Sequence, residues 1–165
     1  MRRMLTAVTL AIAGLTMSGQ GFAAAAPARG AITGAQVVNV ALQYVGLPYR
    51  SHDGNPQVGF SDVGFVRYVY HAAGMTLPHN LKRLLHFAPA VQQDQLQPGD
   101  LVFFKNTIRK GLSHVGIYVG NGTFIHAEYY GSGVRITSFT NDSKDENYWS
   151  AKFKAANRPL AGSST

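Results

Sequence analysis

The spacing of hydrophobic residues changes at Gly99 of this 165-residue chain. Before Gly99, apolar residues recur three or four positions apart, which is typical of helices with one buried face. After it, short apolar segments alternate with turn residues: DLVFFK, HVGIYVG, TFIHAEYY, VRITSF and YWSAKFKAA. Helices followed by strands predict an α+β fold, in which N-terminal helices pack on a five- to six-stranded antiparallel sheet.

Three helices are expected in the first part of the chain. Thr33 is a suitable N-cap for a helix that runs through Tyr44. Ser61 can cap a second helix, which Gly74 ends. Asn80 can cap a short third helix, LKRLLHF.

The length predicts one folded domain behind an export signal. Residues 1–25 combine two arginines, an apolar segment and a run of small residues, as in a signal peptide. We expect a flexible lead at 26–33, the domain at 34–160 and a disordered tail at 161–165. The protein is therefore expected in the periplasm or secreted. The apolar segment is too short for a membrane anchor, and without cysteine no lipid can be attached there.

Charge and cysteine content restrict the chemistry. Removing the signal peptide leaves 13 of the 15 basic residues against 8 acidic ones, a net charge of +5. The basic residues are scattered along the chain, which argues against nucleic-acid binding. The chain has no cysteine, so neither disulfides nor thiol catalysis are available. No cofactor is expected.

Several motifs occur in one order over about residues 35–158. They are GLPY at 46–49, GF..GFV.YVY at 59–70, AGMTLP at 73–78, LQPGDLVFF at 96–104, HVGIYVGNGTFIHA at 114–127 and VRI from Val134. In these motifs the chain resembles the NlpC-type family of cell-wall peptidases. The family comprises papain-like cysteine hydrolases that cut peptide bonds in the stem peptides of peptidoglycan. The resemblance implies a papain-like fold.

The resemblance also assigns site residues. Family members carry D-C-S-G where this chain has S-D-V-G at 61–64, so Asp62 stands at the position of the nucleophilic cysteine. His114 matches the general base, and His126 matches the polar residue that orients it.

Residues around this position are expected to form the substrate groove. His52 and Asp53 replace a glycine pair of the family, and His79 replaces a frequent arginine. We therefore expect Tyr49, His52, Asp53, Ser61 and His79 to contact substrate. The aromatic residues Tyr49, Tyr118, Tyr129, Tyr130 and Trp149 either line a glycopeptide groove or pack in the core.

An aspartate at this position keeps the negative charge of a thiolate at a helix N-terminus. It is a poor nucleophile toward an amide, because the attack would form an anhydride and expel an amine. Ser61 is a possible replacement nucleophile, but an N-cap hydroxyl is normally engaged with the backbone.

The two histidines can meet only if the hairpin between them has the right register. A two-residue Asn121–Gly122 loop would place His114 and His126 on opposite faces of the sheet. A three-residue loop, 120–122, pairs His126 with Gly116 and puts both histidines on one face. We predict the three-residue loop.

Two functions remain open. In the first, the chain is a non-catalytic member that binds stem peptide or a partner hydrolase. In the second, it is a hydrolase that uses water activated by Asp62 and His114, or by a bound metal. Two histidines and one carboxylate, completed by His52 or Asp53, would form such a metal site. We favour the first function and predict no metal site.

Overall fold

A computed structural model describes residues 31–52, 54–130, 133–140 and 147–162. The predicted signal peptide, Asp53 and residues 163–165 lie outside this part of the chain. Among the described residues, no helix has the length and apolar content needed to cross a bilayer.

The three predicted helices are present with their predicted caps. Helix α1 covers Gly34–Leu42 and ends two residues before the predicted Tyr44; a capping box formed by Thr33 and Gln36 starts it. Helix α2 (Asp62–Ala72) begins after Ser61, whose hydroxyl accepts a hydrogen bond from Gly64 N. The short α3 (Leu81–Leu85) is capped by the Asn80 side chain.

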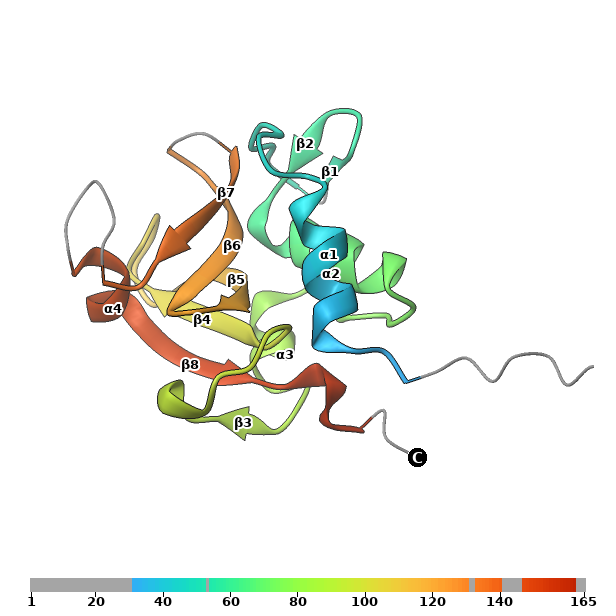
Figure 1. Cartoon of the computed structure of the whole chain (residues 1–165). Coiled ribbons are helices and arrows are strands. Elements are labelled where there is room, and N and C mark those ends of the chain that lie inside the picture. Colours follow the sequence, from blue (N-terminus) through green and yellow to red (C-terminus); the bar gives the residue numbers. More distant parts are fainter. Residues whose placement is uncertain (1–30, 53, 131–132, 141–146, 163–165) are drawn as a thin grey trace, which may run out of the picture. The chain divides into compact units, whose positions relative to one another are not determined.

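The strands form one six-stranded antiparallel sheet and one two-stranded ribbon, which confirms the predicted α+β fold (Figure 1). The sheet order is β3-β8-β4-β5-β6-β7. Its strands are β3 (Ala90–Val91), β4 (Leu101–Lys105), β5 (Leu112–Gly120), β6 (Thr123–Glu128), β7 (Gly133–Ser138) and β8 (Phe153–Asn157). The ribbon pairs β1 (Gly54–Asn55) with β2 (Gly59–Phe60). Two 3-10 turns, η1 (Gln93–Gln95) and η2 (Pro159–Gly162), complete the described elements.

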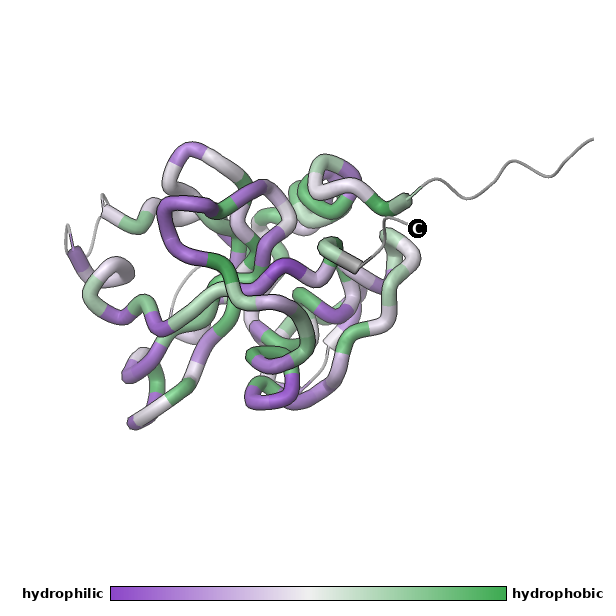
Figure 2. Tube along the Cα trace, turned by 90° about the horizontal axis from the view of Figure 1, so that it is seen from below, coloured by the Kyte–Doolittle hydropathy of each residue, from purple (hydrophilic) through white to green (hydrophobic). Residues whose placement is uncertain are grey.

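The two faces of the sheet bury different hydrophobic clusters. Helices α1, α2 and α3 cover the face that carries Phe103, Val115 and Ile125. The opposite face carries a smaller aromatic cluster, which includes Phe104 and Phe124. Figure 2 shows hydrophobic segments running through the interior and hydrophilic ones in many of the connecting loops.

The C-terminal aromatic segment differs from the prediction of a single strand. Tyr148–Lys152 forms helix α4, and only Phe153–Asn157 continues as a strand. The helix brings Trp149 onto the aromatic cluster, where its ring centroid lies 4.9 Å from that of Phe104 and 5.3 Å from that of Phe124. This packing outweighs the strand preference of the aromatic residues.

The β5–β6 hairpin has the predicted register but reaches it differently. Asn121 and Gly122 form a two-residue turn, both with positive φ, between the paired residues Gly120 and Thr123. A bulge at Val119 then shifts the register, so that Tyr118 pairs with Phe124. The loop is therefore shorter than the predicted three residues, and the bulge supplies the extra residue that puts both histidines on one face.

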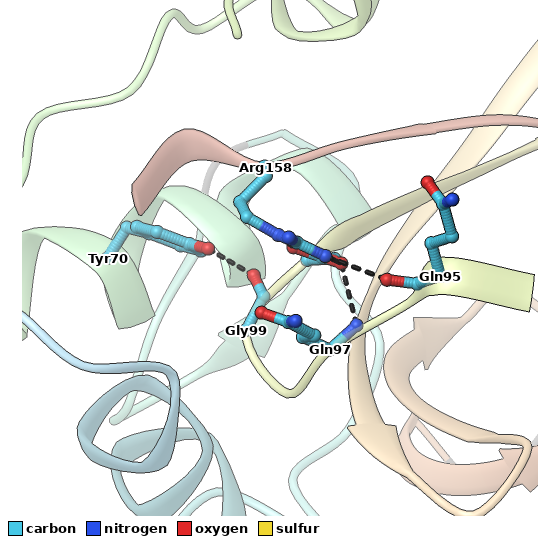
Figure 3. Close-up of polar contacts among 6 residues, drawn as sticks. Tyr70, Gln95, Gln97, Gly99 and Arg158 are labelled. Atoms are coloured by element: carbon cyan, nitrogen blue, oxygen red, sulfur yellow. Dashed lines mark hydrogen bonds and ion pairs between the residues drawn. The ribbon is translucent and has the colours of Figure 1, made fainter. Parts of the chain in front are cut away.

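A buried polar cluster ties the end of the chain to the start of β4 (Figure 3). Arg158, directly after β8, contacts both carboxylate oxygens of Asp100 at 2.8 and 2.9 Å and donates to the Gln95 carbonyl. Tyr70 of α2 donates a hydrogen bond to the Gly99 carbonyl. Helix α2, the segment before β4 and the segment after β8 therefore share this cluster.

Candidate functional site

Asp62 and His114 meet where the first turn of α2 faces the beginning of β5. The Asp62 Oδ2 atom lies 3.2 Å from His114 Nδ1. The Ser61 cap fixes the start of α2, and the pairing of Phe104 with His114 fixes the position of His114 in the sheet. The Asp62 side chain is 13% exposed and that of His114 only 5%. Asp62 is therefore the member of the pair that a ligand can reach.

His114 continues into a chain of polar contacts across the sheet. His114 Nε2 lies 2.8 Å from His126 Nδ1, and His126 Nε2 lies 2.8 Å from the Thr137 hydroxyl. Gly116, between the two histidines, leaves room for this contact, because a Cβ there would lie 3.2 Å from His126 Cβ. The structure thus brings Asp62, His114 and His126 together, as the sequence predicts.

One arrangement of protons satisfies all of these contacts when Asp62 is ionised and both rings are neutral. His114 Nδ1–H then donates to Asp62, so that His114 Nε2 must accept from His126 Nδ1–H. His126 Nε2 in turn accepts from the Thr137 hydroxyl. All four ring nitrogens are therefore engaged within the chain of contacts.

Trp149 of α4 covers the two histidines. Its ring centroid lies 4.8 Å from that of His126 and 5.5 Å from that of His114. Trp149 is 3% exposed and His126 is fully buried. Trp149 is therefore a core residue that shields the histidines from solvent, and it does not line the groove.

An open groove of about 350 Å³ lies over Asp62. Four of the predicted substrate-binding residues line it: Tyr49, His52, Ser61 and His79. The fifth, Asp53, lies outside the described residues. Sequence reasoning did not find the remaining lining residues, which are Val63, Leu81, Ile108, Arg109 and Ser113.

Tyr49 reaches the groove because its segment packs closely beside β2. Gly59, with φ of +105°, lets the backbone approach Pro48, whose carbonyl oxygen would lie 2.0 Å from any Cβ at this position. Burial raises the pKa of the Tyr49 phenol, and the negative charge of Asp62 raises it further. Tyr49 therefore remains a neutral hydrogen-bond donor beside the carboxylate.

The aromatic residues near the groove have different roles. The Tyr49 ring packs edge-on against Tyr129, with centroids 5.0 Å apart. Tyr129 contacts Tyr130 in turn, and both are exposed. Tyr118 instead packs against the aromatic cluster of Phe104 and Phe124, and it is not among the residues that line the groove.

Ser61 lies in the groove wall, but its hydroxyl is engaged. It accepts the Gly64 N–H hydrogen bond at 3.0 Å, and the residue is 8% exposed. Ser61 therefore has the capping geometry that the sequence predicts, and this geometry argues against Ser61 as a nucleophile.

The described residues do not fit a metal centre. They contain no group of three or more histidine, cysteine or acidic side chains placed to hold an ion. His114 Nε2 and His126 Nδ1 face each other at 2.8 Å, so these two nitrogens do not converge on a common point where an ion could bind.

Three residues of the site that were not predicted are Thr137, Arg109 and Ser113. Thr137 anchors the far end of the polar chain, and nothing in its local sequence marks it, because its contact depends on the pairing of β6 with β7. Arg109 reaches the groove from the β4–β5 loop. Ser113 could have been found, since it directly precedes His114.

Comparison with known proteins places this chain in a family. The NlpC/P60 family matches residues 46–158. The chain is 36% identical over 123 residues to the Gamma-DL-glutamyl hydrolase of Bacillus subtilis, covering 74% of this chain and 28% of that protein. It is 35% identical over 126 residues to the Murein DD-endopeptidase MepH of Escherichia coli, covering 74% of this chain and 45% of that protein. The chain thus matches less than half the length of either relative.

Solved structures give the same result. An NlpC/P60 family protein from Bacillus cereus superposes with a TM-score of 0.68 at 28% identity, over 78% of this chain and 40% of that one. The NlpC/p60 domain of the peptidoglycan hydrolase SagA superposes with a TM-score of 0.63 at 29% identity, over 77% of this chain and 99% of that one. Together with the family match over most of the domain, these likenesses show that the chain belongs to the NlpC/P60 family.

Proposed function

We propose that this chain is a non-catalytic NlpC/P60 member that binds peptidoglycan stem peptide in the groove over Asp62. One observation carries the proposal. The side chain that faces His114 at the start of α2 is a carboxylate, 3.2 Å from the ring nitrogen. It reproduces the charge of a thiolate next to a histidine without the reactivity of sulfur.

The choice of ligand rests on the family. Relatives of this chain include a murein endopeptidase and a glutamyl hydrolase, and a solved neighbour is a peptidoglycan hydrolase. The groove is retained with Tyr49, His52 and His79 in its lining. Loss of the nucleophile with retention of the groove favours binding over cleavage.

The proposal includes export to the periplasm or the outside of the cell, where peptidoglycan is found. It rests on the signal-peptide composition of residues 1–25. A partner hydrolase is the other candidate occupant of the groove, and competition between such an enzyme and muropeptide would reveal it.

The test combines binding and cleavage in one experiment. Purified protein is incubated with peptidoglycan and with soluble muropeptides, with and without a chelator. Co-sedimentation, muropeptide affinity and release of new amino groups are measured. We expect binding without new amines in either condition.

Two histidine variants make the test specific. His79→Ala alters the groove lining and should weaken binding, whereas His71→Ala alters an exposed residue of α2 outside the groove and should not. Equal effects of the two variants would contradict binding in this groove.

Hydrolysis by activated water is the second candidate function. The unbroken chain from Asp62 through His114 and His126 to Thr137 favours it, because such a chain can orient a base. New amines that disappear in Asp62→Asn would support this function and overturn the first. Loss of the amines with chelator would identify a metal-dependent form.

A further inference from the structure

We propose that a second cavity next to the groove is a subsite for the carboxylates of an acidic peptide ligand. This inference deepens the proposed function, because it names the chemistry that one end of the groove recognises. The cavity measures about 450 Å³ and lies between α3 and the β4–β5 loop. Its lining residues are Asn80, Leu81, Lys82, Leu85, His86, Arg109, Lys110 and Leu112.

The cavity and the groove adjoin each other. Leu81 and Arg109 line both of them. Along β5, Leu112 lines the cavity and Ser113, the next residue, lines the groove. A ligand that lies over Asp62 can therefore extend past Arg109 into the cavity.

The charge of the cavity has one sign. Lys82, Arg109 and Lys110 are the cations of its lining. None of the described residues that line the cavity is acidic. Within the described part of the chain, these three cations form no salt bridge. Their charge is therefore available to a ligand.

The loop that carries two of the cations is held in place before any ligand arrives. Asn106 N donates to the Gly111 carbonyl, and Gly111 N donates back to Asn106 Oδ1, each at 2.8 Å. Thr107 N donates to Ser113 Oγ at 3.0 Å. These bonds close the loop below Arg109 and Lys110. The backbone of the loop therefore needs little further ordering when a ligand binds.

The shape of the cavity favours a peptide over a single ion. Leu81, Leu85 and Leu112 provide apolar wall between the charged groups. An extended peptide can place its carbon chain on these residues and its carboxylates on the cations, with the guanidinium of Arg109 able to bind a carboxylate through two hydrogen bonds.

The test uses labelled tetraglutamate and tetraglutamine as probes, with binding followed by fluorescence anisotropy. We expect the wild-type protein to bind tetraglutamate at least about tenfold more tightly than tetraglutamine, and the difference to shrink as salt is raised. The triple variant Lys82→Gln, Arg109→Gln and Lys110→Gln should lose this preference.

A second triple variant controls for net charge. This variant combines Arg83→Gln, Lys105→Gln and Lys154→Gln. It removes an equal number of positive charges, but from exposed positions outside the cavity. It should retain the preference for tetraglutamate. Melting temperatures of both variants verify that they fold. Equal loss in the two triples, or equally tight binding of a polyphosphate of the same charge, would overturn the subsite, since either shows general attraction of anions.

Muropeptides separate this inference from the proposed function. If His79→Ala weakens muropeptide binding but the cavity triple binds muropeptide and tetraglutamate as the wild type does, the groove function stands and the subsite is wrong. If wild-type protein binds tetraglutamate through the cavity but no muropeptide, the subsite stands and the proposed function fails.

Discussion

At the scale of single residues, Asp62 decides how the site behaves. It keeps a negative charge beside His114 and at the first turn of α2, two features that lower the pKa of a cysteine in the same place. The surroundings that would activate a thiol are therefore present around a side chain that cannot use them.

Restoring the thiol tests these surroundings. Asp62→Cys, combined with Ser61→Asp and Val63→Ser to rebuild D-C-S-G, should react with a thiol reagent about tenfold faster near neutral pH than an ordinary cysteine, because more of it is thiolate. Aspartate is also a good N-cap, so α2 should remain intact. The rate of labelling by iodoacetamide is the measurement.

A cysteine at exposed Gln93 serves as the control. We expect labelling of the rebuilt site without efficient cleavage of muropeptides, since His52 and His79 also differ from the family pattern. Labelling no faster than at position 93 would mean that His114 does not act on position 62.

Thr137 provides a second prediction at this scale. Thr137→Val keeps the shape of the side chain but removes the partner of His126 Nε2, which is buried. The free energy of unfolding should fall by about 1–3 kcal/mol, because the buried His126 Nε2 loses its hydrogen bond to Thr137. Urea denaturation measures it. Thr76→Val, at an exposed position, should change it little.

At the scale of elements, the hairpin and α4 show what the sequence could predict. The helix caps at Thr33, Ser61 and Asn80 were predictable because capping depends on neighbouring residues. The register of the β5–β6 hairpin was also predictable, but only because the histidines had to share a face. The bulge at Val119 that produces this register has no sequence signal of its own.

Helix α4 was not predictable for a related reason. Its aromatic residues favour a strand locally, and the cluster that Trp149 joins is assembled from β4, β6, β8 and Phe139, which follows β7. The same limit applies to Thr137 and Arg109 in the site, since each becomes a neighbour only after the sheet has formed. Local chemistry thus predicted where the three N-terminal helices start. Tertiary packing determined helix α4 and the contacts of Thr137 and Arg109.

Gly116 gives a prediction for the hairpin as an element. In Gly116→Ala the new methyl group would lie 2.9 Å from a ring carbon of Phe124 and 3.0 Å from the Ile125 carbonyl oxygen. We expect a loss of about 1–3 kcal/mol in the free energy of unfolding, because the strands must move apart. The contact between His114 and His126 should loosen as well, which NMR shifts of the imidazole protons would report. Unchanged stability would indicate that this pairing is wrong.

At the scale of the whole molecule, the cluster around Asp100 joins parts that are distant in sequence. Asp100 is 2% exposed and is paired with Arg158, whose pKa is raised by the hydrogen bonds to Asp100. Tyr70 of α2 is fully buried next to it. Burial raises the pKa of the Tyr70 phenol far above its ordinary value of 10.0, and the charge of Asp100 adds to the effect.

This shift predicts how stability depends on pH in base. The unfolded chain loses the Tyr70 proton near pH 10.0, whereas the folded protein retains it. The contribution of this group is therefore fully present below pH 10 and declines above it, by up to about 1.4 kcal/mol per pH unit. Urea denaturation from about pH 8 to 11 measures the decline, which should be shallower in Tyr70→Phe. Parallel curves for the two proteins would contradict the assignment.

The position of Trp149 over the two histidines allows the site to be followed by tryptophan fluorescence. It is the one tryptophan of the chain, so its emission has a single origin. The centroids of both imidazole rings lie within 5.5 Å of the indole centroid. Emission should therefore change when a ligand in the groove shifts His114 through its contact with Asp62. Trp149 is thus an intrinsic fluorescence probe next to the two histidines, and binding in the groove can be followed without an attached dye.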